Sequence, residues 1–96
     1  MNDQEIIKLW ESDNNEDRVK SLLEIEKLSF KIGEEFPAWV RKILAHAMYH
    51  DYRKYVDGYE IWIHSLCIAG KLCDKYGWDF GVIVLSSAEV EMIEGG

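Results

Sequence analysis

Cysteine and proline are both scarce in this 96-residue sequence, which has two cysteines and one proline. On one helix, Cys67 and Cys73 would lie about 9 Å apart along the axis and point about 120° away from each other. They cannot form a disulfide within that helix. Their spacing is not the C-x-x-C of a redox or zinc site, and both lie among apolar neighbours, so we expect two buried structural thiols.

Positive charge is also in short supply, because 11 basic residues face 18 acidic ones and give a formal net charge of −7. Neutralising phosphates requires clustered Lys and Arg, so we expect no direct binding to nucleic acid. The negative charge favours solubility and suits a basic partner. No cationic segment followed by an apolar run opens the chain, and no apolar run is long enough for a membrane span. We therefore expect a cytoplasmic protein that does not contact membranes.

The common catalytic motifs are absent from the sequence. There is no P-loop, since Gly70-Lys71 is followed by Leu72 and lacks the upstream glycine, and there is no G-x-S-x-G. No pair of catalytic carboxylates stands out among acids that are spread along the whole chain. We expect neither an enzyme of these classes nor a cofactor.

Apolar residues, in contrast, are abundant and have helical spacing. They form 48% of the chain, including four Trp, five Tyr and three Phe, which is enough for a core without metals or disulfides. Residues 59–76 are the richest stretch, and their apolar side chains would cover more than half of a helix surface. The sequence predicts a single all-α domain over residues 1–96, a bundle of four to five helices with 59–76 as its central helix.

Capping residues and glycines divide the chain into helices. We expect helices over 3–11, with Asn2 or Asp3 as N-cap, over about 15–32, over 37 to about 56, and over 59–76. Pro37 suits a first helical turn. The first two helices should form an αα-hairpin, and the very short turn at Asp57-Gly58 should make the last two antiparallel neighbours. The predicted core includes Trp39, Ile43, Ala47, Trp62, Ile63, Leu66 and Cys67.

The C-terminal stretch is ambiguous. We expect a fifth helix over about 80–94, but the β-branched run of residues 82–85 is also compatible with a short strand. A lone strand would leave its backbone groups unpaired unless a second chain supplied the partner strand. In that case the protein would form a homodimer through this edge.

A basic stripe is the most suggestive candidate site. Residues 37–56 hold four basic residues and one acid, a net charge of +3 on an acidic protein. Five side chains would share about 100° of that helix, and they are Lys42, His46, Tyr49, His50 and Arg53. One interpretation is a binding surface for an acidic group. The other is a solvated face that complements acids of neighbouring helices, such as Glu24 or Glu26.

Two motifs have metal-binding spacing, but each lacks a residue that the corresponding metal-binding motif requires. His46 and His50 have the i, i+4 spacing of a two-histidine site, but Ala47 stands where metalloproteases have their general base. The acidic turn matches an EF-hand loop at Asp13, Asn15, Asp17, Ser21 and Glu24, but Arg18 replaces the required glycine. We expect helix capping by the turn residues and no metal site.

Taken together, these features favour a protein-binding module of inhibitor, immunity or adaptor type over an enzyme. An incomplete set of catalytic groups, a high net charge and many aromatic residues all suit a small protein that occupies a partner's surface. Compact acidic proteins of this kind, including those of phages, can also imitate nucleic acid. The alternative is a small metal-dependent or acid–base enzyme built on His46, His50 and His64.

Overall fold

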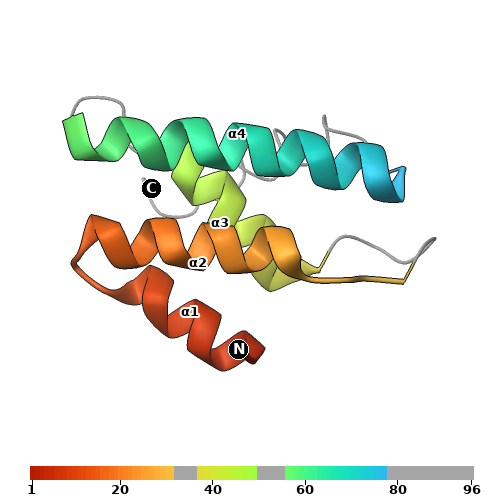
Figure 1. Cartoon of the computed structure of the whole chain (residues 1–96), viewed down its shortest axis with the longest axis horizontal. Helices are drawn as coiled ribbons and strands as arrows, with labels where there is room; N and C mark the ends of the chain where they lie inside the picture. Colours follow the sequence, from red (N-terminus) through yellow and green to blue (C-terminus); the bar gives the residue numbers. More distant parts are fainter. Residues whose placement is uncertain (32–36, 50–55, 78–96) are drawn as a thin grey trace, which may run out of the picture.

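The computed structural model describes residues 1–31, 37–49 and 56–77, and these ranges contain four helices and no strand (Figure 1). The helices are α1 (Asp3–Glu11), α2 (Asn15–Lys27), α3 (Ala38–Tyr49) and α4 (Val56–Tyr76). The all-α prediction is confirmed for this part of the chain. The predicted fifth helix or strand over 80–94 lies outside the described residues.

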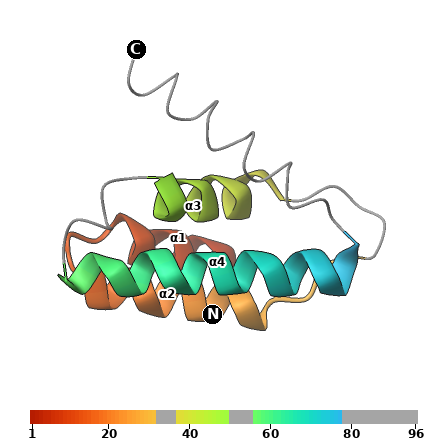
Figure 2. The ribbon, with the colours of Figure 1, turned by 90° about the horizontal axis from the view of Figure 1, so that it is seen from above.

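The helices form two layers. In one layer α1 and α2 run antiparallel as the predicted hairpin, and α4 packs beside α2 on the side away from α1 (Figure 1). The second layer is α3, which packs on α4 and runs in roughly the opposite direction to it (Figure 2). No helix in the described ranges is both long and apolar enough to cross a membrane.

Asparagine caps begin the first two helices. The Asn2 side chain accepts the Glu5 backbone N–H at 2.9 Å, and Asn14 accepts that of Glu16 at 2.8 Å. Each cap satisfies an N–H that has no partner inside the helix, and acids in both first turns favour the positive end of the helix dipole. The predicted bounds of the first helix are confirmed.

The second helix ends earlier than predicted, at Lys27 instead of residue 32. Leu28 is extended, with φ −68° and ψ 149°. Two residues later the Phe30 N–H donates to the Tyr76 hydroxyl at 2.9 Å, and the two rings meet edge to face with centroids 5.7 Å apart. The segment after α2 therefore packs against the end of α4 in place of another helical turn. Because this hydrogen bond favours the phenolate, the pKa of Tyr76 lies below its usual value of 10.0.

Two glycines lie near the ends of α4, and only the second one ends a helix. Asp57-Gly58 was expected to end the preceding helix, and this prediction is wrong, because α4 already begins at Val56. Gly58 is buried, and a left-handed turn is not needed there, since Gly77 alone among the described residues has a positive φ, of 72°. Gly77 ends α4 as predicted, in a conformation that glycine adopts without steric cost. At the start of α3, the Pro37 carbonyl accepts the Arg41 N–H at 2.9 Å.

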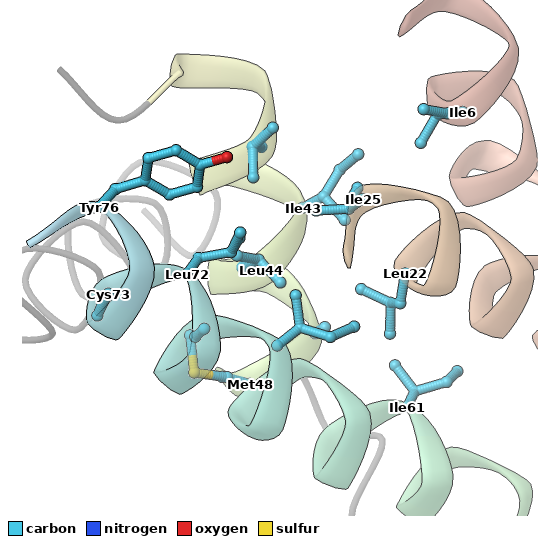
Figure 3. Close-up of a cluster of buried hydrophobic side chains, with 14 residues drawn as sticks. Ile6, Leu22, Ile25, Ile43, Leu44, Met48, Ile61, Leu72, Cys73 and Tyr76 are labelled. Atoms are coloured by element: carbon cyan, nitrogen blue, oxygen red, sulfur yellow. The ribbon is translucent and has the colours of Figure 1, made fainter. Parts of the chain in front are cut away.

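All four helices contribute to one apolar core (Figure 3). Its fully or almost fully buried members include Ile6 from α1, Leu22 and Ile25 from α2, Val40, Ile43, Leu44, Ala47 and Met48 from α3, and Ile61, Ile68, Ala69 and Leu72 from α4. Between α1 and α2, the buried Ser21 hydroxyl donates to the Ile6 carbonyl at 2.8 Å. The hairpin is thus held by one buried hydrogen bond as well as by apolar contacts.

The predicted core is confirmed in part. Ile43 and Ala47 are buried, and Trp39 and Leu66 are partly buried against the core. Ile63, at 37% exposed, and Cys67, which is exposed, do not belong to it. The reason is that α4 packs against α2 and α3 through the buried side that contains Ile61, Ser65, Ile68 and Leu72. The opposite side of α4 includes the exposed residues Glu60, Ile63 and Cys67.

Candidate functional site

The structure describes two side chains of the basic stripe. Lys42 is exposed on α3, and His46 is half-buried. The side chain of Tyr49 and the residues His50 and Arg53 lie outside the description. The stripe as a whole therefore stays a prediction.

His46 does not point into open solvent with Lys42. Its ring meets the Trp10 ring of α1 edge to face, with centroids 6.0 Å apart and planes at 86°. Trp10 itself packs against the core, so this contact ties α3 to the first helix. His46 thus has a packing role between two helices, which the spacing along α3 alone did not reveal.

The acids expected to complement the stripe bind other lysines. Glu26 on α2 pairs with Lys71 on α4 at 2.6 Å, and Glu24 pairs with Lys27 on its own helix at 3.3 Å. The Glu26 carboxylate raises the pKa of Lys71 by accepting its hydrogen bond and by its charge. In the described residues, the charge of Lys42 is therefore not balanced by either of these carboxylates.

Histidine and carboxylate groups do not converge on a metal site in the part of the chain that the structure describes. No three His, Cys, Asp or Glu side chains there are placed to hold one ion. The EF-hand-like turn is used for capping, as predicted. Ser12 donates to Asp17 at 2.9 Å, and its hydroxyl accepts the Asn14 N–H at 3.2 Å, so these side chains stabilise the turn.

An acidic hollow lies beside this turn. It has a volume of about 1210 Å³ and opens between the start of α2 and the first turns of α4. Among the described residues it is lined by Ser12, Asp13, Asn14, Asn15, Glu16, Val19, Lys20 and Glu60. Three of these are acids and one is a lysine, so the described lining has a net negative charge. We refer to it below as the acidic hollow.

Two carboxylates beside the acidic hollow are available to pair with a cationic group. Arg18 donates to Asn15 at 2.7 Å and to the Trp10 carbonyl at 3.4 Å, which holds the turn in place. Within the described residues, the carboxylates of Asp13 and Glu16 have no hydrogen-bond or ion-pair partner. A rigid turn thus presents two exposed negative groups to whatever enters the hollow.

An exposed aromatic residue precedes Glu60 in α4. Tyr59, next to Glu60, is 50% exposed, and its ring lies 5.5 Å from that of Trp62. Sequence reasoning missed this surface, because it assigned most apolar residues of α4 to the core. The signal was present in the apolar content of residues 59–76, which exceeds what one buried helix face requires.

Comparison with models of protein families, with curated proteins and with solved structures found no match to this chain. Its function must therefore be inferred from its own residues.

Proposed function

We propose that this protein is a non-enzymatic binding module, of inhibitor, immunity or adaptor type, that presents the acidic hollow to a basic patch of a partner protein. The observation that supports this proposal is the pair of free carboxylates at Asp13 and Glu16 on a turn whose other polar groups are bonded to one another. Because the turn is already ordered, a partner would pay little entropy to bind it.

The chemistry of the hollow favours a cationic protein surface over nucleic acid. Carboxylates repel phosphates, whereas Arg and Lys side chains form charge-assisted hydrogen bonds with them. A protein that normally binds nucleic acid has such a cationic surface, so the module could also act by imitating phosphates.

The test is capture of partners from a host lysate by the wild type and by two double variants. Asp13→Asn with Glu16→Gln removes the two charges beside the hollow. Asp3→Asn with Glu5→Gln is the control, because it removes two exposed acids from the start of α1, and Glu5, like Glu16, donates its N–H to an asparagine cap.

We expect the wild type and the control to capture the same partner, and the hollow variant to lose it. Rising salt should weaken the captured complex, since charge-driven association weakens as the Debye length shortens. Equal melting temperatures of the two variants would show that both are folded. A partner retained equally by both double variants would contradict the proposal.

The alternative, a small metal-dependent or acid–base enzyme using His46 and His50, makes a different prediction. Protein purified without a histidine tag would then contain stoichiometric zinc, nickel, manganese or iron. Our proposal predicts less than one equivalent of any of them.

A further inference from the structure

The exposed side of α4 has an apolar row with the spacing of a coiled-coil seam. Tyr59, Ile63, Leu66 and Gly70 follow one another at intervals of four, three and four residues, and at 100° per residue they lie within about 60° of each other. Tyr59 is 50% and Ile63 37% exposed, while Leu66 and Gly70 are half-buried. These four residues form the apolar row.

Gly70 is the unusual member of this row. Glycine inside a helix costs about 1 kcal/mol relative to alanine. A Cβ atom at this position would meet no other atom within 4 Å, so no close contact in the described structure requires a glycine here. The space that a side chain would occupy is therefore open at Gly70, and a bulky side chain of another helix can approach the backbone of α4 closely.

We propose that the apolar row is the contact surface between two copies of this chain, with α4 packed antiparallel against α4 of the second copy. The order of side chains along the row supports this arrangement. Tyr59 and Gly70 are equally distant from the midpoint of the row, and so are Ile63 and Leu66. A two-fold axis through that midpoint places the Tyr59 ring of each copy over Gly70 of the other and Ile63 against Leu66, so that the largest side chain meets the residue without one.

Charges beside the row favour the antiparallel direction. In this register, Glu60 of one copy lies within about 3 Å, along the axis, of Lys71 of the second copy, which also pairs with Glu26 of its own chain at 2.6 Å. Both residues are exposed on the same flank of α4. A parallel pair in register would instead bring Tyr59 against Tyr59 and Gly70 against Gly70, and would leave the charges level with their own kind. The row is therefore complementary to itself only when the second helix is reversed.

The proposed contact is short, since it covers about three helical turns. We expect a dimer with a dissociation constant in the micromolar range or weaker, because the buried area falls at the low end for specific interfaces. Asp13 and Glu16 lie outside the apolar row, so the Asp13→Asn, Glu16→Gln variant should dimerise like the wild type.

Sedimentation equilibrium of the full chain over a range of concentrations tests the proposal. The wild type should show a monomer–dimer equilibrium. Gly70→Leu should be monomeric at the same concentrations without a lower melting temperature, because a Cβ atom is free of close contacts at this position and leucine favours the helix more than glycine does. Lys75→Leu is the control, since it adds the same side chain to exposed α4 surface outside the row. It should dimerise normally.

Cross-linking provides an independent measurement of the register. The two Cys67 residues would be about 7.5 Å apart along the axis and on facing flanks, so a short bis-maleimide should couple them. The cross-linked dimer should disappear in Cys67→Ser. A dimer that Gly70→Leu leaves intact would overturn the proposal.

A wild type that is monomeric at all concentrations would overturn it too, and the reactivity of Cys67 would then identify the true occupant. A protected thiol would show that residues 78–96 of the same chain cover the row. A reactive thiol would show that the row is open to a different protein.

Discussion

Leu22 and Leu23 are adjacent in α2, yet the structure places them in opposite environments. Leu22 is 0% exposed in the core, whereas Leu23 is 38% exposed. Replacing either one with alanine makes the same change in helix propensity, so the difference between the two variants reports burial alone. Leu22→Ala removes a fully buried side chain and leaves a cavity, which costs about 3–4 kcal/mol. Leu23→Ala should cost about 1 kcal/mol or less, because its side chain lies at the surface and its removal leaves no enclosed cavity.

Urea unfolding followed by far-ultraviolet circular dichroism measures both free energies of unfolding. For a domain of this size, the expected difference corresponds to a melting temperature roughly 10–20 °C lower for Leu22→Ala than for Leu23→Ala. The dependence of the free energy on urea should be the same in both variants. Equal losses, or a larger loss for Leu23→Ala, would refute the orientation of α2 in the bundle.

Three further predictions concern single side chains. Tyr76→Phe should lower the melting temperature, because the Phe30 N–H loses its acceptor, and ultraviolet titration of the wild type should show a tyrosine ionising below pH 10.0 that this variant lacks. Maleimide should label exposed Cys67 in dilute native protein but Cys73 only after unfolding, and equal labelling would contradict the burial of α4. Lys42→Glu should change the free energy of unfolding by no more than about 1 kcal/mol, since its side chain is exposed, and a larger loss would show that it supports the fold.

The features that could be predicted from the sequence are those with local causes. The start of α1 depends on Asn2 and the N–H three residues later, and the end of α4 depends on the left-handed conformation of Gly77. Both signals lie within a few residues of the boundary that they determine. The same holds for the turn at Ser12 to Asp17, whose side chains bond one another.

Features with distant causes could not be predicted in this way. The end of α2 is tied to Tyr76, which is 46 residues away from its partner Phe30. His46 meets Trp10 from another helix, so its position on the basic stripe did not reveal its contact. For α4, periodicity identified a very apolar helix. It could not show which part of the helix surface the neighbouring helices leave exposed.

The connectivity of the bundle has a consequence for how it folds. The α1–α2 contacts join segments that are close in sequence, and so do the contacts between α3 and α4. Each pair can therefore form with a small loss of chain entropy. The α2–α4 contacts join the two halves and close a much longer loop. We infer that docking of α2 on α4 is the slow step, so that substitutions in α2 facing α4 should retard folding more than equally destabilising ones between α1 and α2.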